Sequence, residues 1–289
     1  MTQRPPRMFV LLVLCVFLAA CSSTPPTTLG ERQFGDAKNN LKSSDFKAAL
    51  DNLNSAIKST NDEALRQQAF VLRVALVTAL ANANEQMAEA YYNGAKQPLA
   101  HANTTGFYKM RSDYSNTARA FLMDAMQSVL DQRAKLGSTA TPIEVAFPGF
   151  TGGDDPALAK IKNGDFVSDN ERVNAELQLD RNCLAHVLAG FAGAGQDLNK
   201  GREIFAAGKV DVDPRVYIVV LSDEFLHIGA MFDTRWNNDA DKFRTVNQVV
   251  RGNLDVATKL LAAKPDKDLE ARVKKMQADC DKCLKKLGA

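Results

Sequence analysis

The sequence is poor in the side chains that carry most enzyme chemistry. Its 289 residues include three histidines and one tryptophan, and aromatic residues make up only 7% of the chain. With so few histidines, we find no set of nucleophile, base and orienting acid, which weakens any assignment as a hydrolase. The glycine cluster GFAGAG (190–195) lacks the G-x-G-x-x-G order and a preceding strand, so a phosphate loop is not indicated. We expect a non-enzymatic protein without a cofactor.

The sequence also lacks a surplus of either charge. Lysine and arginine together number 36 and the acidic residues 34, which gives a formal net charge of +2. Binding to a phosphate backbone needs a basic surplus or a basic stripe. We therefore expect no nucleic-acid partner.

Runs of alternating apolar and polar residues joined by hairpin turns are absent, and helical periodicity takes their place. Segment 45–58 sets Phe46, Ala49 and Leu53 on one stripe, and a longer segment, 62–93, has the same period. Further helices are predicted over 115–136, 239–263 and 266–287. The predicted class is all-α, built from antiparallel helical hairpins that form either a solenoid or a helical bundle in two halves.

Helix start signals support this assignment. Thr60 with Glu63, and Ser168 with Glu171, have the spacing of capping boxes, in which a hydroxyl and a carboxylate each satisfy a free amide. Asp213 followed by Pro214 predicts an N-cap and a proline at the first helical position. A helix is therefore expected over 214–232 despite the β-branched residues at its start.

The N-terminus has the three parts of an export signal. Arg4 and Arg7 precede a thirteen-residue apolar run (8–20), which is shorter than the roughly 20 residues needed to span a bilayer. A small, polar segment follows this run. We expect a signal peptide over residues 1–20 and a flexible tether over 21–30, where SSTPPTTLG has two prolines and no helical period.

The end of the leader, Leu18-Ala19-Ala20-Cys21, resembles the lipobox of bacterial lipoprotein precursors. The resemblance implies that Cys21 receives a diacylglyceryl group, that the leader is cut before it and that the new amine is acylated. Two or more acyl chains give stable membrane anchoring. Ser22 after the cysteine resembles default sorting to the outer membrane. The implied location is the cell envelope, on the periplasmic face of that membrane.

A segment rich in proline and glycine divides the mature chain. Residues 137–156 contain three prolines and four glycines, and loops of this length are either functional or mark boundaries. We interpret this segment as the connection between an N-terminal helical half (31–136) and a C-terminal one (157–289). A short extended piece is possible at IEVAF (143–147).

Three segments resemble the second half of a tetratricopeptide repeat. They begin at Asp45-Phe46, Asp197-Leu198 and Asn253-Leu254, each followed by small and large residues at helical spacing. True tandem copies recur every 34 residues, which these do not. A lipobox combined with cryptic repeats also resembles the lipoprotein components associated with some solute transporters.

Three cysteines remain in the mature chain after Cys21 is assigned to the lipid. In an oxidising envelope a disulfide among Cys183, Cys280 and Cys283 is the leading interpretation of these residues. A local bridge between Cys280 and Cys283 would distort a helix, so Cys183 is a candidate partner for one of them.

Two further features are candidates for function. Glu224 and His227 form Glu-x-x-His, which puts both on one helix face, where they could ligate a metal or form a hydrogen-bonded pair. A complete metal site would need more ligands than the sequence shows. Trp236 lies in an expected loop between helices, where it could anchor a partner or fill a gap.

These observations leave two main hypotheses. The first is a membrane-anchored scaffold that binds another envelope protein. The alternative is a small-molecule binding component of a transporter, with its pocket between the two halves near residues 137–156. An enzyme that uses Glu224 and His227 is a weaker third hypothesis.

Overall fold

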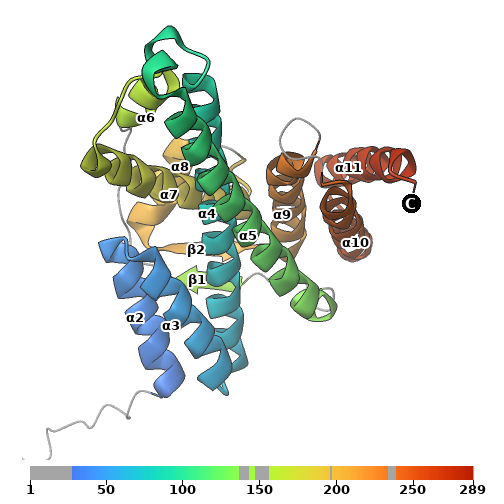
Figure 1. Cartoon of the computed structure of the whole chain (residues 1–289). Helices are drawn as coiled ribbons and strands as arrows, with labels where there is room; N and C mark the ends of the chain where they lie inside the picture. Colours follow the sequence, from blue (N-terminus) through green and yellow to red (C-terminus); the bar gives the residue numbers. More distant parts are fainter. Residues whose placement is uncertain (1–27, 137–142, 147–155, 196, 234–238, 289) are drawn as a thin grey trace, which may run out of the picture.

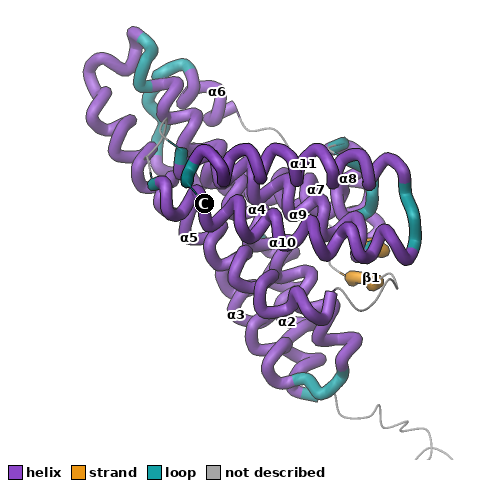
Figure 2. The backbone as a smooth tube through the Cα atoms, turned by 90° about the vertical axis from the view of Figure 1, so that its right-hand side faces the viewer, coloured by secondary structure: helices purple, strands orange, loops and turns teal. Residues whose placement is uncertain are grey.

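The computed structural model describes residues 28–136, 143–146, 156–195, 197–233 and 239–288. Apart from one pair of short strands, the regular elements of these residues are helices, so the all-α prediction is confirmed (Figures 1 and 2). The residues before the connecting segment form α2 (Leu29–Ser43), α3 (Phe46–Ser59), α4 (Glu63–Gly94), the short 3₁₀ helix η1 (Pro98–Asn103) and α5 (Thr104–Leu136).

The second half is also helical. It contains α6 (Pro156–Lys162), α7 (Asp169–Phe191), α8 (Leu198–Ala207), α9 (Pro214–Gly229), the 3₁₀ turn η2 (Ala230–Phe232), α10 (Ala240–Ala263) and α11 (Lys267–Lys286). Figure 1 shows α4 and α5 as a long hairpin. The pair α2 and α3 lies at one end of it, α6 at the other, and α9 to α11 on one side.

Helix α4 is the centre of the molecule. It contacts α3 and α5 from its own half and α6, α7 and α9 from the other. Consequently it is buried nearly all round, including Val71, Val74 and Val77 beside the predicted stripe. Among the described helices α4 alone is long and apolar enough to cross a membrane, but 67% of its most apolar window is buried inside the protein.

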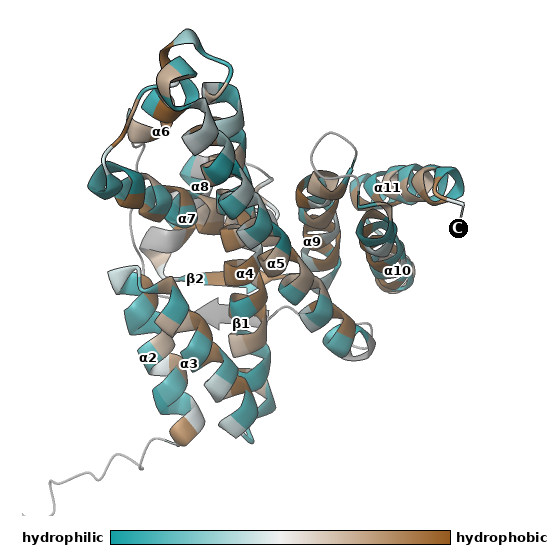
Figure 3. Ribbon diagram, in the orientation of Figure 1, coloured by the Kyte–Doolittle hydropathy of each residue, from teal (hydrophilic) through white to brown (hydrophobic). Residues whose placement is uncertain are grey.

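The two halves share one hydrophobic core. The cluster of buried apolar residues is continuous from Phe34 in α2 to Cys280 in α11. In Figure 3 the apolar colouring is strongest on the inner faces of the helices around α4 and α9. The two halves therefore do not have separate cores. Their side chains pack against each other in one continuous core.

The capping predictions were partly correct. Ser168 and Glu171 form the predicted capping box at the start of α7, and Asp213 caps α9 ahead of Pro214. The box predicted at Thr60 was wrong, because α4 begins at Glu63 with Asp62 as its N-cap. The Asp62 carboxylate accepts hydrogen bonds from the amides of Ala64 and Leu65, which leaves the Thr60 hydroxyl to accept one from the Asp62 amide.

Two helices begin earlier than predicted. Thr28 and Glu31 form a capping box that starts α2 at Leu29, so the last residues of the predicted tether (21–30) belong to this helix. Helix α5 starts at Thr104 rather than at 115. Its first turns are held by Phe107 and Tyr114, whose rings lie 5.4 Å and 5.6 Å from that of Tyr91 in α4. Packing against α4 thus keeps residues 104–114 helical, although their hydrophobic periodicity is weak.

The connecting segment contributes a strand to the second half. Strand β1 (Ile143–Ala146) confirms the extended piece and pairs antiparallel with β2 (Lys209–Val212), with Ile143 opposite Val212. Strand β2 was not predicted, although its side chains alternate between exposed and buried. The rest of segment 137–155 lies outside the described residues.

The repeat-like segments do not behave alike. Asp45 caps α3, and the Asp197 carboxylate accepts from the amides of Asn199 and Lys200 at the start of α8, so both lie at turns between helices. Asn253 is buried in the middle of α10, within the helix predicted over 239–263. The resemblance to tetratricopeptide repeats stays a prediction.

Candidate functional site

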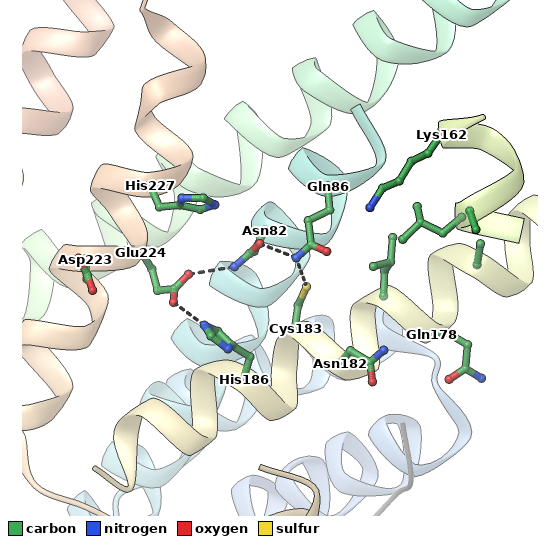
Figure 4. Close-up of a pocket in the computed structure, with 14 residues that line it drawn as sticks. Asn82, Gln86, Lys162, Gln178, Asn182, Cys183, His186, Asp223, Glu224 and His227 are labelled. Carbon is green, nitrogen blue, oxygen red and sulfur yellow. Dashed lines mark hydrogen bonds and ion pairs between the residues drawn. The ribbon is translucent and has the colours of Figure 1, made fainter. Parts of the chain in front are cut away.

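A pocket lined by several polar side chains lies between the two halves. It has a volume of about 670 Å³, and we call it the central pocket. It is lined by α4 from the first half and by α6, α7 and α9 from the second (Figure 4). Ligand pockets fall in the range of roughly 300–1,000 Å³ and often lie between helices or domains.

Helical spacing explains how the polar side chains reach this pocket. Asn82 and Gln86 lie one turn apart on α4 and share a face. On α7 the lining residues recur at helical intervals and include Gln178, Asn182 and His186. On α9 the lining residues are Asp223, Glu224 and His227. These polar side chains thus come from three helices that are distant in sequence.

Glu224 is the centre of the polar network. Its side chain is 8% exposed, and its Oε1 lies 3.2 Å from Nε2 of His186 on α7. Its Oε2 accepts a hydrogen bond of 3.0 Å from Nδ2 of Asn82 on α4. A buried charge is tolerated when it is paired and hydrogen-bonded in this way. One carboxylate therefore joins α9 to both α4 and α7.

The network continues along α4 to the thiol of Cys183. Gln86 Nε2 donates to Asn82 Oδ1 at 3.0 Å and to Cys183 Sγ at 3.4 Å. The hydrogen bond to Glu224 raises the pKa of His186 above its ordinary value, and partial burial opposes this rise. Burial and the nearby carboxylates raise the pKa of Cys183, which keeps it a neutral thiol rather than a reactive thiolate.

The predicted partnership of Glu224 with His227 is not formed. Both residues line the central pocket, as the shared helix face predicted, but Glu224 binds His186. His227 is 63% exposed, and its Nε2 lies 3.9 Å from Oε2 of Glu85. Among the described residues, no group of three His, Cys, Asp or Glu side chains is placed to hold a metal ion.

A second group of titratable residues lies on the other side of α7. Tyr114 donates to Glu176, which also accepts a 2.5 Å hydrogen bond from Arg172. Asp180 lies one turn beyond Glu176 on the same helix. Burial, with a smaller effect of the Glu176 charge, raises the pKa of Asp180 to about 7. Ionisation of the Asp180 carboxyl group therefore lowers the stability of the folded state.

The three predicted disulfide cysteines are free thiols in the structure. Cys183 is buried on α7 beside the central pocket, whereas Cys280 and Cys283 lie on α11. Cys280 faces the core, where burial raises its pKa to about 11. The structure thus shows no disulfide among these residues. The other two predicted sites, Cys21 and Trp236, lie outside the described residues.

Searches with protein-family models, against curated proteins and against solved structures find no match for this chain. The chemistry of the central pocket is therefore inferred from its own residues.

Several residues of the central pocket were not predicted as site residues. His186 on α7 is one of them. Asn82 and Gln86, which also line the pocket, were missed, as was Glu85 near His227. A signal for these three was present, since they are polar residues within the most apolar helix of the chain. Buried polar groups in such a helix need partners from other elements.

Proposed function

We propose that this protein is a lipid-anchored, non-enzymatic component of the bacterial cell envelope that binds a small molecule in the central pocket. The observation that carries the proposal is a pocket of about 670 Å³ between the two halves, whose polar side chains come from four helices. The alternative hypothesis from the sequence expected a pocket between the two halves near residues 137–156. Helix α6, which starts at the end of the connecting segment, forms one of its walls.

The mixture of polar and apolar lining supports binding rather than catalysis. Amide side chains such as Asn82 and Asn182 stand beside the apolar side chains of Leu158 and Leu179. Such a lining can orient a ligand by hydrogen bonds and cover its apolar part. The Cys183 thiol is neutral, and Glu224 is engaged by two partners, so neither is prepared as a nucleophile.

Membrane attachment rests on the lipobox at Leu18 to Cys21. With the leader removed, basic and acidic residues balance at 34 each, because Arg4 and Arg7 account for the excess in the full count of 36 and 34. Acyl chains on Cys21 would hold this neutral body at the membrane surface. Association with a transporter, as in the lipoproteins that the sequence resembles, is part of the proposal.

A second function, docking to an envelope protein, is favoured by exposed apolar residues. Phe166 is 83% exposed, Leu99 67% and Tyr108 44%. Phe166 lies in the loop that follows α6. In the same loop the backbone of Gly164 lies close to Ala100, so this loop packs against η1. The region is at the α6 end of the molecule, away from α2 (Figure 1). A photocrosslinker at Phe166 should capture a specific protein more efficiently than one at the exposed Gln248 on α10.

Small-molecule binding can be tested by thermal unfolding of the full-length chain, purified in detergent, against a library of polar metabolites. A ligand present at 100 times its Kd stabilises the folded state by about 2.7 kcal/mol. Ala159 lies on α6 at the pocket wall and is exposed, so Ala159→Trp should fill the pocket without disturbing the core. Ala262→Trp, at an exposed position on α10, is the matched control. If no compound stabilises the wild-type chain, the proposal fails.

A further inference from the structure

One end of the central pocket carries a lysine, Lys162, that has no counter-charge among the described residues. Lys162 is the last residue of α6, is exposed and lines the pocket. Figure 4 shows its ammonium group directed towards Gln86 on α4. Within the described part of the chain it makes no ion pair. By contrast, Lys160 on the same helix binds Glu171 at 2.6 Å and does not line the pocket.

The other end of the pocket carries two carboxylates. Asp223 and Glu224 are adjacent on α9, and Figure 4 places both on the side away from Lys162. Asp223 is fixed by an ion pair with Arg272 of α11, and Glu224 by His186 and Asn82. An ionised carboxylate has about four acceptor positions, so each can still accept a hydrogen bond from a ligand.

The wall between the two ends suits a small backbone-like molecule. Gln178 and Asn182 carry amide groups, a type of group that can both donate and accept. Gln86 contributes an acceptor oxygen, because its amide nitrogen already donates to Asn82 and Cys183. Leu158 and Leu179 supply an apolar surface beside them. The described lining residues include no Trp, Tyr or Phe on which a sugar ring could stack.

The positive end favours a carboxylate over a phosphate. Lys162 is the sole lysine or arginine among the described lining residues, which matches a single negative charge. Phosphate sites commonly add a bidentate arginine or a helix N-terminus to a lysine, and the described lining residues include no arginine.

We propose that the central pocket binds a zwitterion of the amino-acid or short-peptide class, with its carboxylate at Lys162 and its ammonium group at Asp223 and Glu224. This inference rests on the proposed function and names the ligand class for the same pocket. The opposite charges at the two ends fix the direction of the ligand, and the amide groups between them meet its peptide bond. Electrostatic complementarity of this kind sets specificity between ligands of similar size.

The test is calorimetric titration of the full-length chain in detergent. The probes are leucine and the dipeptide Ala-Leu, and the comparison compounds are N-acetyl-Ala-Leu, Ala-Leu amide, succinate and glucose. We expect saturable binding of leucine, Ala-Leu or both, and at least a tenfold loss of affinity when either charged group of the bound probe is blocked. Lys162→Met should lower the affinity for the free dipeptide at least tenfold but leave the affinity for the dipeptide amide unchanged. Lys160→Met should bind as the wild type does.

The acidic end has its own variants. Glu224→Gln should lower the affinity for the free dipeptide but not the affinity for its N-acetyl form. If Glu224→Gln does not fold, Asp223→Asn provides the same test, because Asp223 is more exposed than Glu224. Pocket-dependent binding of succinate or glucose in preference to the dipeptide and leucine would overturn the zwitterion proposal and leave the proposed function standing. If neither these probes nor the metabolite library bind, both proposals are wrong.

Discussion

The carboxylate of Glu224 on α9 lies 3.2 Å from the imidazole of His186 on α7, and together they form the polar centre of the protein. Asn82 of α4 binds the other oxygen of the same carboxylate at 3.0 Å. The pair therefore links the central helix α4 to α7 and α9, two of the three second-half helices that border the pocket. This relationship leads to predictions about stability, protonation and binding.

Loss of the Glu224 carboxylate should destabilise the fold. Glu224→Ala leaves His186 and Asn82 without their common partner in a buried position, and breaking a buried pair costs about 3 kcal/mol or more. Urea denaturation at pH 7 measures this cost. Asp113→Asn, which breaks an exposed pair with Lys109 on α5, is the control and should cost less than about 1 kcal/mol. A similar, small loss in both variants would contradict this role of Glu224.

The protonation of His186 should depend on Glu224. The pKa of His186 is raised in the folded state, so its stabilising contribution is complete below about pH 6.5 and is lost as the pH rises through the folded value. Imidazole chemical shifts measured by NMR should give a pKa above 6.5 in the wild type. In Glu224→Gln the pKa should fall, because burial then acts without the carboxylate. An unchanged pKa would show that the two side chains do not interact in solution.

Asp180 should make the protein less stable as the pH rises. Its folded pKa of about 7 lies above the unfolded value, so between roughly pH 4 and 7 the folded chain binds more protons and the free energy of unfolding falls. Asp180→Asn removes this dependence. At pH 8 the variant should be more stable than the wild type by about 2–4 kcal/mol, with the difference disappearing near pH 4. Equal stability at pH 8 would contradict the burial of this charge.

Membrane attachment should depend on Cys21. Cys21→Ser removes the thiol that the lipobox resemblance assigns to acylation, so metabolic labelling with a fatty acid should be lost and an uncleaved or mislocalised precursor should remain. Cys283→Ser, which alters a thiol on α11, is the control and should be labelled normally. Normal processing of the Cys21→Ser chain to a soluble protein would exclude the lipobox interpretation.

Local signals in the sequence predicted much of the fold, because caps act over only a few residues. Ser168 with Glu171 and Asp213 with Pro214 located the starts of α7 and α9, where side chain and free amide are neighbours in the chain. The start of α5 was missed because it depends on Phe107 packing against Tyr91 of another helix.

The site was predicted less well for the same physical reason. Helix spacing correctly placed Glu224 and His227 on one face, but spacing within a helix does not determine which side chain of another helix comes opposite. Glu224 thus bound His186, and His227 came to lie near Glu85, neither of which shares its helix. The clearest missed signal was the polar group around Asn82 inside the apolar sequence of α4, which required partners from elsewhere in the fold.

The central claim is that the pocket between the two halves holds a small molecule, and calorimetric titration of pocket variants tests it most directly. The most stabilising compound from the thermal screen is titrated into wild-type, Ala159→Trp and Ala262→Trp chains. We predict saturable one-to-one binding to the wild type and to Ala262→Trp, and none to Ala159→Trp. Equal binding to all three proteins would place the ligand elsewhere and contradict the account.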